Sequence, residues 1–238
     1  MRVRVRYRKQ GRLRFVSAID VGRLWERALR RADLPIAYSE GFSPHPKVSF
    51  TDALTLGYAS TGEYAELTFA APVELSRDIA ALNAAFPEGM DVLTAVHTPD
   101  GAPRFSKALA ASCWDVEYPV GAVLDHAVQQ VASAATLVVP RERKGEAVDV
   151  DIRPAIADIS ADGPRVRVTV HHIDHLPDDV AVAIRPSEVD LALRRFQPDL
   201  AQPVLVTRLA QGRPGPDGLV EALSGELVEP LQTQRQTT

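Results

Sequence analysis

Charged and apolar residues alternate strictly at the start of the chain. Every second residue from position 2 to position 8 is an arginine, with Val3, Val5 and Tyr7 between them. Because successive side chains of a β-strand point to opposite faces, the pattern predicts a strand over 2–9 with one wholly cationic face. After a break at Gln10 and Gly11, the alternation resumes. The arginines of this row are Arg2, Arg4, Arg6 and Arg8, continued by Arg12 and Arg14.

The first hundred residues have the element order of a small α+β unit. Apolar residues at helical spacing predict an amphipathic helix over about 20–32, and its opposite face carries four arginines. Ser76 is a suitable N-cap for a second helix that ends near Phe86. Further strands are predicted at 36–39, 63–70 and 90–96. The order β-α-β-β-α-β is that of a ferredoxin-like unit, here over residues 1–98.

The second half repeats this order more loosely. Residues 97–107 contain prolines and a glycine and predict a linker. Strands are predicted at 114–118, 136–139, 165–170 and 204–207, helices at 123–135 and 186–196, and extra strand material near 149–157. We therefore expect an α+β fold of two tandem ferredoxin-like units, at 1–98 and 108–210. Residues 211–238 show little periodicity and predict a disordered tail.

The expected topology decides where the arginine row lies. In a ferredoxin-like unit both helices cover one face of the sheet, so the arginines would lie on the other face, beside Tyr64, Glu66 and Thr68. RNA-recognition modules of similar topology hold bases on that face. Nucleic-acid phosphate is one partner for the row, because guanidinium groups match phosphate geometry. Pairing with glutamates across the strands, or a solvated face, is the alternative.

The net charge of −4 conceals an asymmetry along the chain. Residues 1–50 carry twelve lysines and arginines against four acids, a net charge of +8, so the remaining residues carry −12. This distribution predicts one local basic surface on an otherwise acidic body.

Composition narrows the class of protein. No apolar run in the 238 residues approaches the roughly 20 that span a bilayer, and the basic N-terminus lacks the apolar segment of a signal peptide. Cys113 is the single cysteine, so the chain alone can form neither an internal disulfide nor a cysteine-rich metal or iron–sulfur site. We expect a cytoplasmic protein without a cofactor or a membrane association.

The loop at 41–50 holds the best local candidate for chemistry. Two prolines flank His45 and reduce the entropy lost when His45 and Lys47 are held outward. An imidazole beside an ammonium group could bind phosphate or act in acid–base catalysis. A rigid turn with a solvated His45 is the alternative. Since no second acid–base group converges on His45, we predict no catalytic residue.

Two Ile-Arg-Pro motifs place Arg153 and Arg185 directly before prolines. The residue before a proline is extended, which projects each arginine from the chain, although neighbouring aspartates could neutralise Arg153. His171 and His172 would point to opposite faces of a strand, so they predict no metal site. The predicted nucleic-acid-binding residues are Arg2, Arg4, Arg6, Arg8, Arg12, Arg14, His45, Lys47, Arg153 and Arg185.

A dense set of motifs resembles one bacterial family. It comprises GRLRFVS at 11–17, Asp20, ERALRRA at 26–32, LPIAYS at 34–39 and GFSPHPK at 41–47, followed by DIRP at 151–154, Arg185-Pro186 and Thr207-Arg208. Over about 1–210 the chain resembles the radical-SAM-linked bacterial family, a domain of unknown function that is fused to, or encoded beside, a radical SAM protein. Because this chain lacks the three-cysteine motif of that enzyme, the resemblance implies a stand-alone partner. The family usually has histidine at the position of Ala18, which argues against a catalytic or ligand role there.

The residues and the resemblance together predict a non-catalytic accessory protein. It would bind RNA, such as tRNA or ribosomal RNA, through its basic N-terminal sheet face and work with a radical SAM protein. Two alternatives stay open. One is an RNA-modifying or RNA-cleaving enzyme that uses His45 as acid or base. The other is a protein-interaction module whose arginines meet an acidic partner.

Overall fold

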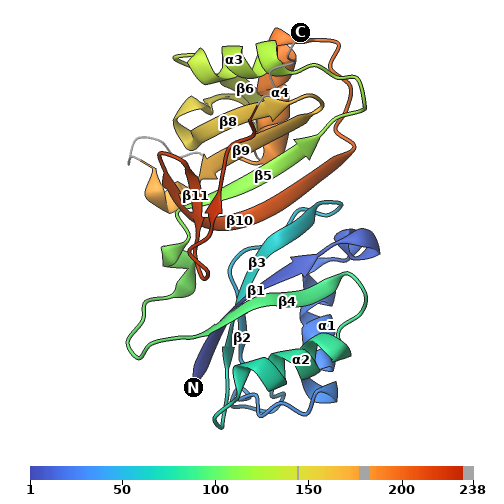
Figure 1. Cartoon of the computed structure of the whole chain (residues 1–238), viewed down its shortest axis with the longest axis vertical. Coiled ribbons are helices and arrows are strands. Elements are labelled where there is room, and N and C mark those ends of the chain that lie inside the picture. The colour runs from blue at the N-terminus through green and yellow to red at the C-terminus, as the bar shows by residue number, and fades with distance from the viewer. Residues whose placement is uncertain (144, 177–182, 233–238) are drawn as a thin grey trace. The chain divides into compact units, whose positions relative to one another are not determined.

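The computed structural model describes residues 1–143, 145–176 and 183–232 (Figure 1). The chain divides into two compact units. The first consists of Met1–Ala108 together with Leu223–Gly225, and the second runs from Leu109 to Ala222 and continues from Glu226. In the described parts of the chain, no helix is long and apolar enough to cross a membrane.

The first unit is an antiparallel sheet with two helices. Its elements are β1 (Arg2–Lys9), the 3-10 helix η1 (Gly11–Phe15), α1 (Ala18–Arg31), β2 (Val48–Phe50), β3 (Ala59–Thr68), α2 (Leu75–Ala85), β4 (Met90–His97) and the 3-10 helix η2 (Phe105–Ala108). β1 is central and pairs with β4 on one side and β3 on the other, and β2 pairs with the far edge of β3. All of these pairings are antiparallel.

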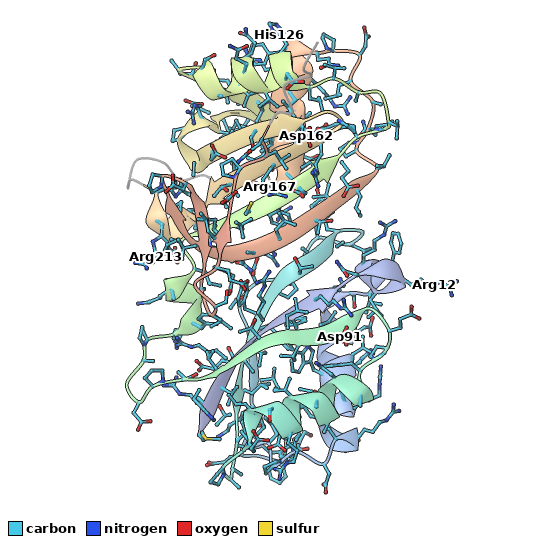
Figure 2. The ribbon with its side chains drawn as sticks, in the orientation of Figure 1. Arg12, Asp91, His126, Asp162, Arg167 and Arg213 are labelled. Carbon is cyan, nitrogen blue, oxygen red and sulfur yellow. The ribbon has the colours of Figure 1, made fainter. Side chains whose placement is uncertain are left out.

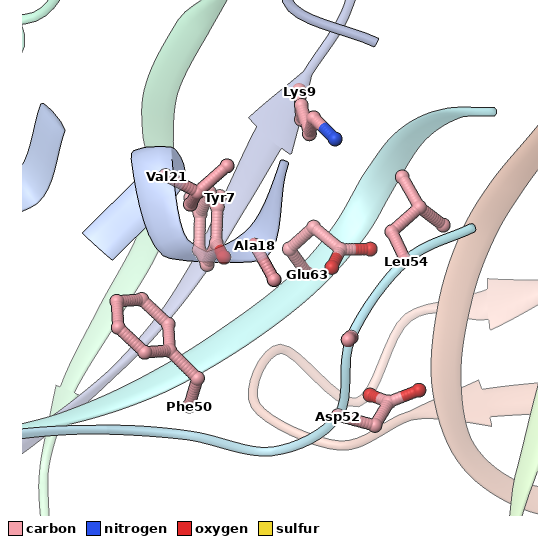
Figure 3. A pocket seen from close by; sticks show the side chains of 9 residues that line it. Tyr7, Lys9, Ala18, Val21, Phe50, Asp52, Leu54 and Glu63 are labelled. Carbon is pink, nitrogen blue, oxygen red and sulfur yellow. The ribbon is translucent and has the colours of Figure 1, made fainter. Parts of the chain in front are cut away.

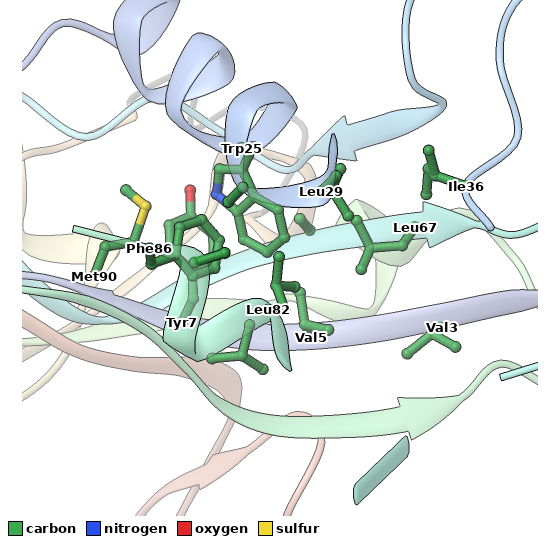
Figure 4. Packing of buried hydrophobic residues seen from close by; sticks show 14 of the residues in the cluster. Val3, Val5, Tyr7, Trp25, Leu29, Ile36, Leu67, Leu82, Phe86 and Met90 are labelled. Atoms are coloured by element: carbon green, nitrogen blue, oxygen red, sulfur yellow. The ribbon is translucent and has the colours of Figure 1, made fainter. Parts of the chain in front are cut away.

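The core of the first unit lies between one face of this sheet and the two helices (Figure 4). The apolar residues of β1 are buried and alternate with its arginines. The buried side chains of α1 recur at helical spacing, and its Trp25 packs edge-on against Tyr7 and Phe86 at ring-centroid distances of 5.1 and 4.8 Å. Ser17 begins α1 by accepting a hydrogen bond from the backbone N–H of Asp20. The pattern of β1 and of the first helix is therefore confirmed.

The second unit has the same element order with an added hairpin. Its elements are β5 (Ala111–Glu117), α3 (Asp125–Ser133), β6 (Val138–Arg143), β7 (Glu146–Asp151), η3 (Arg153–Ala155), β8 (Ile156–Asp162), β9 (Arg165–His171), η4 (Ile173–His175), α4 (Pro186–Phe196), β10 (Leu205–Gly215), β11 (Gly218–Glu221) and β12 (Leu227–Val228). The strand order β10-β5-β9-β8 is antiparallel throughout. β6 and β7 form a separate two-stranded sheet. The α+β fold class is thus confirmed.

Three local predictions in the first unit are wrong. Residues 11–15 form η1, so Arg12 and Arg14 do not extend the strand. The second strand is β2, because Ile36 and Tyr38 form only isolated bridges, to Phe69 and Pro46. α2 is capped by the Glu74 carboxylate, which accepts from the backbone N–H groups of Ser76 and Arg77, and this places Ser76 inside the helix.

The predicted disordered tail from 211 is also wrong where the structure describes it. β10 continues to Gly215, and β11 and β12 add to it as antiparallel strands. Leu219 is fully buried and packs with Ala111, Cys113 and Ala210. The segment has too few apolar residues to show a period, but a strand can be held by backbone hydrogen bonds and one buried side chain. Residues 233–238 lie outside the described residues.

Substitution of Gly212 tests whether β10 and β11 pack closely against each other. A Cβ at Gly212 would lie 1.9 Å from the Val220 carbonyl oxygen, whereas a Cβ at Gly215 would meet its nearest atom at 3.6 Å. Since the Gly212 contact is with backbone, Gly212→Ala must displace β11. We expect it to lower the free energy of unfolding by about 1–3 kcal/mol in urea denaturation, as overpacking does. Gly215→Ala is the control and should change it little. Equal, small effects would contradict the packed hairpin.

Candidate nucleic-acid interface

The arginine row of β1 lies on the sheet face opposite the core, as predicted, and acids face it there. Glu66 on β3 is directly opposite Arg4 in the register. Its two carboxylate oxygens lie 2.9 Å from Arg4 Nε and 3.1 Å from Arg2 Nη1. On the other side, Arg8 Nε lies 2.6 Å from a carboxylate oxygen of Asp91 on β4. Arg2, Arg4 and Arg8 are therefore paired with acids across the strands, which is the alternative to phosphate binding that the sequence left open.

Arg4 and Arg6, in the middle of the row, also contact other groups of the protein. The Arg4 guanidinium lies 4.7 Å from the ring centroid of Phe105 and donates to the Pro103 carbonyl, and its side chain is 11% exposed. Phe105 is itself buried and packs edge-on against Tyr64. Arg6 Nε donates to the Thr61 carbonyl at 2.7 Å. That Arg2, Arg4, Arg6 and Arg8 contact phosphate stays a prediction, but the geometry gives them structural partners.

Arg12 and Arg14 lie on η1 and differ in exposure. Arg12 is exposed and extends away from the first unit, while Asp91 lies against the sheet (Figure 2). Arg14 is half-buried, and its guanidinium lies 4.8 Å from the ring centroid of Phe15. Neither shares the sheet face with the arginines of β1.

The loop that carries His45 and Lys47 is fixed at its base and exposed at its tip. The Ser39 backbone N–H donates to the His45 carbonyl, and the His45 backbone N–H donates to the Ser39 hydroxyl, at 2.8 and 3.0 Å. The side chains of His45 and Lys47 are exposed, and the ring of Phe42 is fully exposed. His45 Nδ1 lies 3.5 Å from the Glu26 carboxylate, so the loop lies beside α1.

The outer face of α1 presents a stripe of exposed arginines. Arg23 pairs with Asp20 at 2.9 Å, and the Ser17 hydroxyl and then Arg23 lower the pKa of the Asp20 carboxyl. Within the residues that the structure describes, Arg27, Arg30 and Arg31 form no side-chain hydrogen bond or ion pair. We call this stripe and the adjoining loop the α1 surface. It comprises Arg27, Arg30, Arg31, Tyr38, Phe42, His45 and Lys47.

Arg153 and Arg185 belong to the second unit. The Arg153 guanidinium donates to the carbonyls of Ala132 and Ala134, where α3 ends, and to that of Ile156. The last carbonyl groups of a helix have no partner within the helix, so an arginine that donates to them there is favourable, and its positive charge also suits the negative end of the helix dipole. Arg185 is exposed, and its backbone N–H donates to the Glu188 carboxylate at the start of α4. Their binding of nucleic acid stays a prediction.

The other titratable candidates show no converging site. Burial, with His175 nearby, lowers the pKa of His171. Among the described residues, no group of three or more histidines, cysteines and acids could hold a metal ion. Arg208, from the resemblance motif, is almost fully buried with its guanidinium 5.1 Å from the Trp114 ring centroid.

Sequence reasoning missed a small cavity in the first unit (Figure 3). It has a volume of about 220 Å³, and its lining includes Lys9 and Glu63, which are 3% and 4% exposed. The signal for it was present in the sequence. Lys9 continues the inward-facing series of Val3, Val5 and Tyr7 along β1, where a charged residue is out of place.

Comparison with known proteins identifies the family. A family model matches residues 2–186, and the chain therefore belongs to the family described as "uncharacterized protein conserved in bacteria (DUF2344)". No curated protein matches the chain. Similar solved structures include a Cbf5-Nop10-Gar1 complex and an archaeal box H/ACA sRNP Nop10-Cbf5 complex, both at 12% identity, with TM-scores of 0.44 and 0.42. Each alignment covers 88% of this chain and 48% of the other, so this chain spans about half the length of those it matches.

Arg4→Gln tests the structural role of the arginine row. Because Arg4 loses a charge-assisted hydrogen bond in a nearly buried position, we expect the free energy of unfolding to fall by about 1.5–3 kcal/mol. Arg2→Gln is the matched control, since Arg2 contacts the same glutamate but is 34% exposed, and its effect should be smaller. Urea denaturation measures both. If Arg4→Gln has a negligible effect on the free energy of unfolding, the contacts of Arg4 with Glu66 and Phe105 do not stabilise the first unit.

Cys113 should be inert in the native protein. Burial raises the pKa of its thiol to about 11, with the Thr169 hydrogen bond and Arg167 opposing the shift. Only the thiolate reacts with a disulfide reagent. At pH 8 we expect labelling of the native chain to be at least about a hundredfold slower than in urea, where the thiol pKa returns to about 8.5. The native rate should rise with pH up to about 11. Fast native labelling at pH 8 would contradict the packing of β5.

Proposed function

We propose that this chain is an accessory protein that binds RNA through the α1 surface and acts together with a radical SAM enzyme. The observation that carries RNA binding is the exposed row of Arg27, Arg30 and Arg31, which form no ion pair within the described residues. The radical SAM partner rests on the sequence resemblance. The protein would be non-catalytic by itself, because the side chain of His45 is exposed and its pair with Glu26 is therefore not shielded from water.

The charge of α1 favours an anionic partner. The helix carries four arginines against two acids, and one of the acids pairs with Arg23. Successive arginines along one helix face can contact successive phosphates, and each contact releases condensed counterions. His45 extends the same surface beyond the helix, and Lys47, two residues further along the same loop, is also exposed.

The aromatic residues of the α1 surface favour unpaired bases. Phe42 is fully exposed and Tyr38 is 44% exposed, and the backbone of Tyr38 pairs with Pro46 beside His45. Exposing a phenyl ring to water is unfavourable, but the ring can stack on an unstacked base. Such stacking stabilises a complex by about 1–3 kcal/mol per base. Single-stranded or looped RNA, as in tRNA or ribosomal RNA, offers such bases.

We also infer that both units are ferredoxin-like. In the first unit the chain order β1-α1-β2-β3-α2-β4 gives the sheet order β4-β1-β3-β2. In the second unit β5, β8, β9 and β10 take the corresponding places, with the β6–β7 hairpin inserted after α3. This arrangement leaves α1 with one face on the sheet and the other available to a ligand.

Neutralising the stripe should weaken RNA binding. We expect Arg27→Gln with Arg30→Gln to reduce the affinity for a fluorescein-labelled tRNA and to flatten its salt dependence. The slope of log K against log salt should fall by about 0.7–0.9 for each phosphate contact removed. Fluorescence anisotropy across a salt series measures both quantities. The matched control is Arg104→Gln with Arg213→Gln, which removes two exposed arginines elsewhere and should leave the slope unchanged.

A second pair of variants separates the two candidate surfaces. Arg4→Gln with Arg6→Gln should lower stability and leave the salt slope intact, because acids and carbonyls already hold these side chains. If this pair flattens the slope and the α1 pair does not, the interface is the sheet face. Absence of binding at low salt would overturn the proposal altogether, and capture of an acidic protein by the same residues would favour the interaction-module alternative.

A further inference from the structure

Three large apolar side chains of the first unit are exposed to solvent. Phe15 is 60% exposed, Ile19 72% and Leu56 61%. They come from the end of η1, the first turn of α1 and the segment between β2 and β3. Single exposed apolar residues are ordinary on a protein surface, but several that come together from separate segments mark a surface that another molecule covers. We call these three residues the apolar patch.

The segment between β2 and β3 lies directly against η1. The Gly57 backbone N–H donates to the Arg14 carbonyl at 2.8 Å. A Cβ at Gly57 would lie 3.9 Å from the Phe15 ring. Leu56, the residue before Gly57, is therefore close to Phe15 although the two are far apart in the sequence.

The small cavity of the first unit opens at this surface. Its lining includes Ala18 and Ala53, which are both exposed, so the cavity is open to solvent beside them. Ile19 follows Ala18 in the first turn of α1, and Leu54, two residues before Leu56, also lines the cavity. The apolar patch thus continues into a hollow.

The size and lining of the cavity suit one apolar side chain. Its volume of about 220 Å³ lies below the roughly 300–1,000 Å³ of sites for drug-sized ligands. Val21, Tyr7 and Phe50 form one side of it in the view of Figure 3. The charged residues of its lining have partners within the protein, so they do not call for a charged ligand. They are Lys9, Glu63 and Asp52.

The charge beside the apolar patch is positive. Asp20, next to Ile19, accepts hydrogen bonds from the Ser17 hydroxyl and from Arg23. In contrast, within the residues that the structure describes, the side chains of Arg12 and Arg14 form no hydrogen bond or ion pair, and Arg14 contacts only the Phe15 ring. The acids nearby are therefore matched within the protein, and two arginines are left for a partner.

We propose that the apolar patch docks an acidic amphipathic helix of a partner protein, which inserts one large apolar side chain into the cavity. Such a helix carries apolar anchors on one face and charges along its margins. Its carboxylates meet Arg12 and Arg14, and its apolar face covers Phe15, Ile19 and Leu56. The site does not depend on RNA binding, since it shares no residue with the α1 surface.

Two other occupants match the patch less well. RNA bases stack on aromatic rings and guanidinium groups, whereas Ile19 and Leu56 are aliphatic. A second copy of this chain in a symmetric dimer would place the same patch on both sides of the interface. It would thereby bring the arginines of both copies together and supply no acid to match them.

A peptide selection on the full chain tests the proposal. The probe is a display library of helical peptides of about four turns, randomised at both apolar and charged positions. Selection on the wild type is combined with counter-selection on Ala18→Leu, which fills the entrance of the cavity. We expect the enriched peptides to be acidic and to share one aromatic or leucine anchor. Replacing that anchor with alanine should weaken binding at least about tenfold.

Variants of the patch should then weaken the selected peptide in different ways. By fluorescence anisotropy, Ile19→Gln and Leu56→Gln should each reduce its affinity at least about tenfold. Arg12→Gln with Arg14→Gln should reduce both the affinity and its dependence on salt. Ala18→Leu should reduce the affinity although it adds apolar surface, which separates anchor insertion from general stickiness.

Val123→Gln is the matched control. Val123 is 69% exposed but belongs to the second unit, so this variant should bind the peptide as the wild type does. Urea denaturation checks that every variant folds. If Ala18→Leu does not fold, Ile19→Gln serves in the counter-selection, because its side chain is exposed.

Several results would overturn the proposal. The library might enrich no sequence or basic sequences, or Val123→Gln might weaken the peptide as much as Ile19→Gln does. Sedimentation might show a dimer that Ile19→Gln dissociates, which would make a second copy the occupant. If tRNA displaces the peptide and Ile19→Gln weakens tRNA binding, the patch belongs to an RNA interface instead. A chain that binds no RNA at all would leave the docking proposal intact.

Discussion

The first unit depends on a strand that is apolar on one face and cationic on the other. β1 lies between two neighbours, so neither of its faces can turn away from the sheet. The apolar face is covered by α1 and α2. On the opposite face, arginines two residues apart lie close enough to repel one another, and Glu66 and Asp91 supply the opposite charge at the positions where β3 and β4 pair with β1. This neutralisation allows a strand with four arginines to be central.

The same neutralisation makes the arginines of β1 poorer ligands for phosphate than those of α1. A guanidinium that already has a carboxylate partner gains little from a phosphate, because it must give up one strong hydrogen bond to form another. The arginines of α1 have no such competitor among the described residues, apart from Arg23 with Asp20. The arginines of residues 1–50 are thus divided between a set that stabilises the sheet and a set that faces solvent.

Elements with a clear period could be predicted from the sequence. The alternation in β1 and the apolar spacing of α1 and α4 gave the right elements, because in each a buried face recurs at a fixed interval. β2, with three residues, and β11 and β12, with four and two, are too short to show a period. The expected topology places Glu66 beside the arginine row, but neither its pairing with Arg4 nor the contact of Arg4 with Phe105 could be predicted, since both depend on side-chain packing between residues far apart in the sequence. Lys9 and Glu63 continue the inward-facing series of their strands, but because charged residues are rarely buried, the pattern alone does not predict their burial.

The two sides of α1 have different surroundings. Its inward side contributes Val21 to the cavity, and its outward side carries the exposed arginines from Arg23 to Arg31. The cavity is present because the inward series along β1 ends in Lys9 and the first helical turn offers only the small Ala18. A longer apolar side chain at either position would close the space and continue the core. The burial of Lys9 and Glu63 is tolerated because both side chains have partners within the protein, Lys9 among them with the Val16 carbonyl, so hydrogen bonds and charge pairing replace apolar packing at this end of the core.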